Sequence, residues 1–239
     1  MRIYDLSPID DALLFSADVQ HQLTVLRPLG RGQSYEGHWV PLPVWPLKKP
    51  RKRRTEPLCD LSSVAAMSSL PVLSARARQC FEPILEPYAQ WLPLAFDDEP
   101  RWLLNSLRVI EALDEPRSQI TRFDDGRVSG IETYAFVESQ VADEWLFKVA
   151  TFPYLVLVTD RFRDLVMRSG LTGFHFQPVW DSEHRPFRPT PGKAEMLTRP
   201  EIYGPDGFVP NMREYWPAEW KEQARQMKRS GKAGATIGP

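Results

Sequence analysis

The sequence has few of the residues that build disulfide frameworks and metal centres. Its 239 residues contain only two cysteines, Cys59 and Cys80, and four histidines. Two separated cysteines in a chain of this length favour reduced structural thiols over a disulfide. The histidines, at positions 21, 38, 175 and 184, have no partner at the spacing of zinc ligands. The sequence therefore predicts no metal site and no cofactor.

Long apolar runs and a net charge of one sign are also missing. No stretch approaches the roughly 20 apolar residues that cross a bilayer. The N-terminal segment has early acidic residues and no apolar run of signal-peptide length. The formal net charge is −1, which gives no overall field toward nucleic acid or an anionic membrane. These absences predict a soluble, cytoplasmic, globular protein with no membrane partner.

Recognisable catalytic motifs are absent as well. The sequence contains no P-loop, nucleophile elbow or dinucleotide fingerprint. Gly30-Arg31-Gly32 resembles the start of a phosphate-binding glycine loop, but the later glycine and lysine are missing, so we interpret it as an ordinary loop. Adjacent carboxylates occur at four turns, where solvated pairs are common, and spacing along the chain does not identify a catalytic pair. These motifs therefore identify no catalytic residues.

What the sequence does contain is a clear structural unit between Tyr154 and Trp180. A continuous apolar run at 154–158 predicts a buried strand. Thr159 or Asp160 can cap a following helix, and Gly170 can end it in the left-handed conformation. Apolar residues at 174, 176 and 179 then return to a two-residue period, which predicts a second strand.

Shorter patterns surround this unit. Ser74 can cap a helix whose apolar stripe reaches Tyr88, and Pro83 is expected to kink or divide it. Strands are predicted at about 102–110 and 145–149. A hairpin is expected around Asp125-Gly126, because Asp-Gly suits turn positions with positive φ.

These elements predict an α+β fold: a single domain with a mostly antiparallel sheet flanked by a few short helices, plus a C-terminal helical extension. We assign residues 1–192 to the domain, with its motif-bearing core at about 70–180. Residues 193–239 form the extension, with one amphipathic helix beginning at Pro217.

Charge is distributed unevenly along the chain. From Glu86 to Glu144 there are thirteen acidic residues against five arginines and no lysine, a local charge of −8. The segment up to Arg54 has nine basic and five acidic residues, a local charge of +4, and ends in the basic run KKPRKRR at 48–54. We interpret that run as a solvated surface loop. An acidic region steers basic partners, although ordinary solubility explains it equally well.

Several short motifs, in a fixed order, give the chain a family resemblance. They are LSARARQCFEPILEPYAQWLPL (73–94), LLNSLRVIEALD (103–114), S-x-I-x-R-F-D-D-G-R (118–127), Y-A-F (134–136), L-F-K-V (146–149), L-V-T-D-R-F (157–162) and G-L-T-G-F-H-F (170–176). This series resembles the family-eleven immunity proteins of bacterial polymorphic toxin systems, first catalogued as a domain of unknown function. The resemblance covers about Leu70 to Trp180.

The resemblance implies a non-catalytic protein that binds a cognate toxin and blocks it by occlusion. Our candidate contacts are the acidic loop residues Asp97, Asp98, Glu99, Asp124, Asp125, Asp143 and Glu144. One alternative is an enzyme acting on a small or modified substrate, with His175 or His184 meeting a carboxylate in a deep pocket. Another is a nucleic-acid-binding module that uses residues 48–54, whose affinity would fall steeply with salt. The sequence makes no prediction of the toxin's activity or of the oligomeric state.

Overall fold

The computed structural model describes residues 1–9, 12–47, 57–65 and 67–183. The chain divides into two compact units, Met1–Ser118 with Thr133–Phe187, and Gln119–Glu132 with Arg188–Pro239. The basic run at 48–54, the domain boundary at 192 and the helix expected after Pro217 lie outside the described residues, so these remain predictions.

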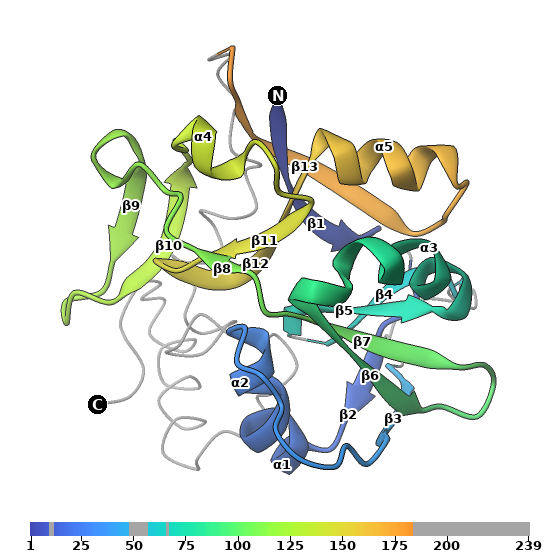
Figure 1. Cartoon of the computed structure of the whole chain (residues 1–239). Helices are drawn as coiled ribbons and strands as arrows, with labels where there is room; N and C mark the ends of the chain where they lie inside the picture. The colour runs from blue at the N-terminus through green and yellow to red at the C-terminus, as the bar shows by residue number, and fades with distance from the viewer. Residues whose placement is uncertain (10–11, 48–56, 66, 184–239) are drawn as a thin grey trace, which may run out of the picture. The chain divides into compact units, whose positions relative to one another are not determined.

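The first unit contains a five-stranded sheet whose order is β13-β1-β12-β11-β8. Its strands are β1 (Arg2–Pro8), β8 (Val109–Ile110), β11 (Leu146–Val149), β12 (Phe152–Thr159) and β13 (Phe174–Asp181). Ile3 of β1 lies opposite both Thr159 and Trp180, and both pairings are antiparallel. The first strand of the chain therefore occupies the interior of the sheet, between two late strands (Figure 1).

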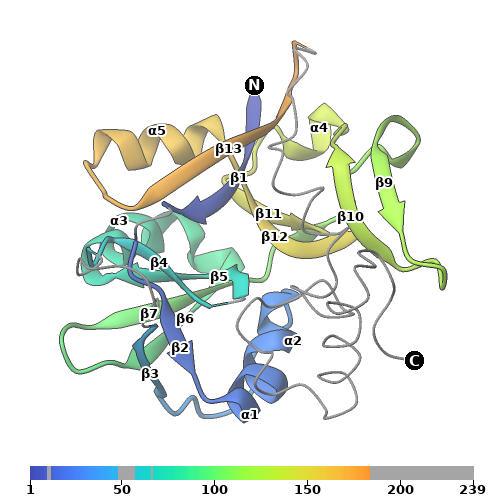
Figure 2. The same cartoon turned by 180° about the vertical axis from the view of Figure 1, so that it is seen from behind.

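The other strands of this unit close into a six-stranded barrel of order β2-β3-β6-β7-β5-β4. They are β2 (Phe15–Ala17), β3 (Leu42–Pro46), β4 (Leu61–Val64), β5 (Met67–Ser74), β6 (Ala89–Ala95) and β7 (Arg101–Ser106). Two parallel pairings complete the closure, Phe15 with Val64 and Leu42 with Leu94. The barrel strands lie below the five-stranded sheet in both views (Figures 1 and 2).

Helical segments in the described part of the chain are short. They are α1 (Val19–His21), a π-helical turn (Gln22–Leu26), α2 (Arg27–Gly30), α3 (Ala75–Leu85), α4 (Glu138–Val141), α5 (Asp160–Arg168) and two 3₁₀ turns (Glu86–Tyr88 and Glu115–Arg117). Ser74 caps α3 as predicted, since its Oγ accepts the Ala77 amide at 3.1 Å. Pro83 lies two residues before the end of α3, and the helix continues through it to Leu85 without dividing.

Two hydrophobic cores stabilise the first unit. One fills the barrel and includes Phe15, Leu70 and Leu103, all fully buried. The other lies among the five-stranded sheet, the outer barrel wall, α3 and α5, where the Phe81 and Phe162 rings are 4.7 Å apart. The barrel wall therefore has apolar residues on both faces where it meets this second core.

The described part of the second unit is a hairpin made by β9 (Gln119–Arg122) and β10 (Val128–Thr133), although Thr133 itself belongs to the first unit. The Phe123 amide donates to Arg127 O at 2.8 Å, and Gly126 has a φ of +83°. The predicted Asp-Gly turn is therefore confirmed.

The observed fold fits the predicted α+β class, but the strands do not form one sheet. They divide between a barrel and a separate sheet. The strand expected at 102–110 is accordingly broken, because β7 belongs to the barrel whereas β8 pairs in parallel with β11 of the other sheet.

Candidate functional site

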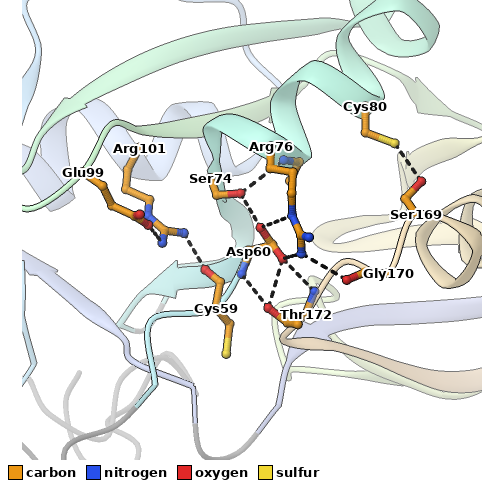
Figure 3. A network of polar contacts seen from close by, with 11 residues as sticks. Cys59, Asp60, Ser74, Arg76, Cys80, Glu99, Arg101, Ser169, Gly170 and Thr172 are labelled. Atoms are coloured by element: carbon orange, nitrogen blue, oxygen red, sulfur yellow. Dashed lines mark hydrogen bonds and ion pairs between the residues drawn. The ribbon is translucent and has the colours of Figure 1, made fainter.

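The densest polar cluster surrounds Asp60, which immediately precedes β4. Its Oδ1 accepts from the Ser74 hydroxyl at 2.7 Å and from Arg76 Nε at 3.2 Å. Its Oδ2 accepts from Arg76 Nη2 at 2.5 Å and from the Thr172 amide at 2.8 Å and hydroxyl at 3.0 Å. Figure 3 shows these groups converging on the carboxylate from α3 and from the loop before β13. The cluster therefore links three segments far apart in the sequence.

Asp60 is fully occupied as an acceptor. Burial raises the pKa of its carboxyl, but the hydrogen bonds from Arg76, Ser74 and Thr172 outweigh burial and hold the pKa well below its usual range. Arg76 also donates to the Gly170 carbonyl at 3.0 Å. A carboxylate that is held ionised by five hydrogen bonds is a poor proton acceptor, so this cluster is suited to joining segments rather than to acid–base chemistry.

A buried arginine lies near this cluster at the start of β7. The Arg101 side chain is only 1% exposed and donates to the Cys59 carbonyl at 2.5 Å. Its other terminal nitrogen bonds the Glu99 carboxylate, as Figure 3 shows. Burial lowers the pKa of the guanidinium, yet arginine stays charged in proteins. Arg101 therefore anchors one end of the β6–β7 turn.

Lys148 is a second buried cation. It lies in β11, is fully buried, and donates to Gly30 O at 2.7 Å. Burial lowers the pKa of its ammonium to about 7. Its hydrogen bond satisfies a carbonyl in the last turn of α2, where a cation also opposes the negative end of the helix.

The alternative enzymatic reading requires His175 or His184 to meet a carboxylate in a pocket. His175 lies exposed on β13, and His184 lies outside the described residues. Burial raises the pKa of the Cys59 thiol, which disfavours the reactive thiolate. Within residues 1–9, 12–47, 57–65 and 67–183, no group of three or more His, Cys, Asp or Glu side chains is arranged to hold a metal.

Comparison with known proteins gives one family. Residues 35–181 match the immunity protein family (Imm11). The chain belongs to the Imm11 immunity protein family. The resemblance seen in the motifs at 70–180 is thereby confirmed, and the match extends further toward the N-terminus. A search of curated proteins gives no match.

The Imm11 region contains all seven acidic residues predicted to contact a toxin. Asp97, Asp98 and Glu99 are exposed in the β6–β7 turn. Asp124 and Asp125 are exposed in the hairpin of the second unit, where Arg127 donates to Asp125 from its amide at 3.0 Å and its side chain at 2.7 Å. These hydrogen bonds lower the pKa of Asp125.

The remaining two acidic residues differ from each other. Asp143 is exposed, whereas Glu144 is 9% exposed and accepts from Arg108 Nε at 2.9 Å and Nη2 at 2.5 Å. Within the first unit, the segment after α4 that carries this pair lies far from the β6–β7 turn in both views (Figures 1 and 2). The acidic loops of this unit therefore do not form one continuous patch.

The structure also shows features of the Imm11 region that the sequence did not reveal. Arg101 follows a run of acidic residues and resembles an ordinary surface residue. Burial of Lys148 could have been predicted, since a lysine inside the apolar strand LFKV must bury its stem or its charge.

No helix in the described ranges combines the length and apolar character needed to span a membrane.

Proposed function

We propose that this chain binds a cognate toxin protein and neutralises it by occlusion, without catalysis of its own. The observation that carries the proposal is the family match over residues 35–181. The state of the polar groups supports it, because Asp60 is saturated with hydrogen bonds and Arg101 and Lys148 are committed to backbone carbonyls. A cytoplasmic location, where a cell would need protection from its own toxin, remains part of the proposal.

A stable inhibitory complex needs an interface of standard size, on the order of 1,600 Å² in total. Such interfaces combine a few aromatic or arginine anchors with a charged rim. The exposed members of the acidic set, at Asp97–Glu99, Asp124-Asp125 and Asp143, remain candidates for that rim. Glu144 is a weaker candidate because its carboxylate is already bound to Arg108.

The test is whether this chain protects against the protein encoded by the neighbouring toxin gene. We expect the two purified proteins to co-elute, and we expect co-expression to restore growth to cells that produce the toxin. Protection should require near-equimolar amounts, because occlusion is stoichiometric whereas an enzyme would protect at low ratios. Full protection at one immunity molecule per hundred toxin molecules would contradict occlusion.

The nucleic-acid alternative is tested separately. Residues 48–54 lie outside the described residues, and a solvated loop remains the prediction for them. Binding to DNA or RNA that weakens steeply between about 50 and 200 mM salt would favour the alternative. We expect no binding at the higher salt concentration.

A further inference from the structure

Strand β3 exposes an uncharged apolar row on the outside of the barrel. Its residues Leu42 and Val44 are buried, whereas Pro43, Trp45 and Pro46 are exposed. The Trp45 residue is 47% exposed, and Val40 just before the strand is 69% exposed. No Asp, Glu, Lys or Arg occurs between Glu36 and Lys48. Contiguous exposed apolar residues with a polar border are typical of protein interaction sites.

The apolar row continues onto the neighbouring strand. Pro43 is the register partner of Ala95 in β6, and Ala95 is also exposed. On the other side, Trp45 is opposite Ser16 of β2. Strand β3 is thus paired with β6 at its first two residues and with β2 along Val44–Pro46, where Trp45 lies.

An acidic rim borders this row. Strands β3 and β6 are parallel, so β3 runs toward the β6–β7 turn. Ala95, the partner of Pro43, ends β6, and after one further residue the chain reaches the exposed Asp97, so the acidic turn lies just beyond the paired part of β6. Asp97 and Asp98 are exposed and make no side-chain hydrogen bond or ion pair with another described residue, and Glu99 is held by Arg101. An apolar centre is thus followed by negative charge at one end.

The β3 row is also rigid before any partner arrives. Prolines at 41, 43 and 46 fix their own φ angles near −65°. A preorganised surface loses little conformational entropy on binding, which favours affinity. Tryptophan is among the residues most enriched at the energetic centres of interfaces.

We infer that the outer face of β3 is the toxin-docking surface, with Trp45 as its anchor and the turn at 97–99 as its acidic rim. The fitting partner surface has an apolar pocket for the indole and basic residues beside it, by complementarity of charge. This inference rests on the proposed function and assigns a location to it. It uses one of the predicted acidic loops, at 97–99, and places Asp143 of the same unit outside the centre of the contact.

The experiment measures binding of the purified product of the neighbouring toxin gene by biolayer interferometry. Trp45→Ala tests the anchor, Asp97→Lys with Asp98→Lys tests the rim, and Met167→Ala is the matched control. Met167 is 64% exposed on α5, away from the barrel, so its loss removes a similarly exposed apolar side chain. Thermal melting of each variant establishes that it is folded.

We expect Trp45→Ala to raise Kd by about 30-fold or more, as loss of an interface anchor does. The double lysine variant should lower the association rate by roughly tenfold at low salt, and less at high salt. Met167→Ala should change Kd by less than about threefold, in line with residues that are not anchors.

Three outcomes would overturn the inference. The first is a Kd for folded Trp45→Ala within threefold of the unaltered protein. The second is loss of binding only when the basic run at 48–54 is neutralised, which would indicate an acidic partner surface. The third is light scattering that shows a dimer of this chain abolished by Trp45→Ala, which would assign β3 to self-association. No binding by the unaltered protein would instead contradict the proposed function, and with it the basis for this surface.

Discussion

The ammonium of Lys148 lies 2.7 Å from the carbonyl oxygen of Gly30, although the two residues are 118 positions apart in the chain. Lys148 is the only lysine within the described ranges. Its contact fastens the end of α2 to the five-stranded sheet. A charged group in such a position makes the stability of the fold depend on pH.

We therefore predict that stability rises with pH between about 7 and 10.5. The pKa of Lys148 is about 7 in the folded protein against an ordinary value of 10.5, so across this range the unfolded chain binds a proton that the folded chain lacks. The slope is at most about 1.4 kcal/mol per pH unit and vanishes below pH 7, where both states are protonated. Urea unfolding of the native protein and of Lys148→Met at several pH values measures it. Equal slopes in the two proteins would show that Lys148 does not titrate in this way.

The Asp60 cluster should contribute strongly to stability. Asp60→Ala removes the acceptor of the Ser74, Arg76 and Thr172 donors, and we expect a loss of roughly 2–4 kcal/mol. The exposed pair of Arg127 and Asp125 is the control, since Arg127→Ala should cost less than about 1 kcal/mol. Chemical denaturation measures both. Similar losses for the two variants would contradict a special role for the buried carboxylate.

Asp60 also predicts sensitivity to acid. Its folded pKa is held below the ordinary value of 3.8, so its contribution is present above that pH and is lost as pH falls toward the folded pKa. Unfolding of the native protein between pH 5 and 2 should therefore show a steeper loss of stability than Asp60→Asn. Parallel curves for the two proteins would remove Asp60 as a cause of acid denaturation.

Gly173 is predicted to tolerate no side chain. A Cβ at this position would lie 2.4 Å from Cys59 Cβ and 2.7 Å from Leu61 O, and its φ is +88°. Gly126 is the matched control, because its φ is +83° but a Cβ there meets nothing within 4 Å. Gly126→Ala should cost only the backbone strain of about 1–2 kcal/mol, and Gly173→Ala clearly more. Equal melting temperatures of the two variants would contradict a steric role for Gly173.

Asp143 and Glu144 are predicted to differ in their contributions to stability. Glu144→Gln weakens the charged hydrogen bonds from Arg108 and should destabilise the fold by roughly 1–2 kcal/mol. Asp143→Asn should leave stability within about 0.5 kcal/mol, because Asp143 is exposed and Arg161 bonds its backbone carbonyl. Thermal unfolding distinguishes them. A destabilised Asp143→Asn would indicate a structural role that its exposure does not suggest.

Local signals in the sequence predicted the local elements. The cap at Ser74, the Asp-Gly hairpin and the unit from Tyr154 to Trp180 each depend on residues close in the chain, and each is present. Thr159 shows the limit of such reasoning. It is the N-cap residue of α5, but its hydroxyl donates to Glu144 O at 2.7 Å instead of capping the helix.

The sequence patterns did not predict which strands pair with each other across long stretches of chain. Closure of the barrel joins Phe15 to Val64 and Leu42 to Leu94, and no local period encodes such partners. The same holds for the candidate site. The sequence composition was enough to select the acidic loops. Trp45 could not be selected as a candidate anchor without the parallel pairing of β3 with β6, which leads toward the acidic turn.

The interior position of β1 has a consequence for how this protein is made. Residues 2–8 leave the ribosome well before their partners at 157–159 and 174–181. Strand β1 lacks these partners while the intervening polypeptide is translated, and the five-stranded sheet can assemble only after β13 has been made. A nascent chain that stalls before residue 174 would carry an incomplete sheet with β1 open to aggregation or to capture by a chaperone.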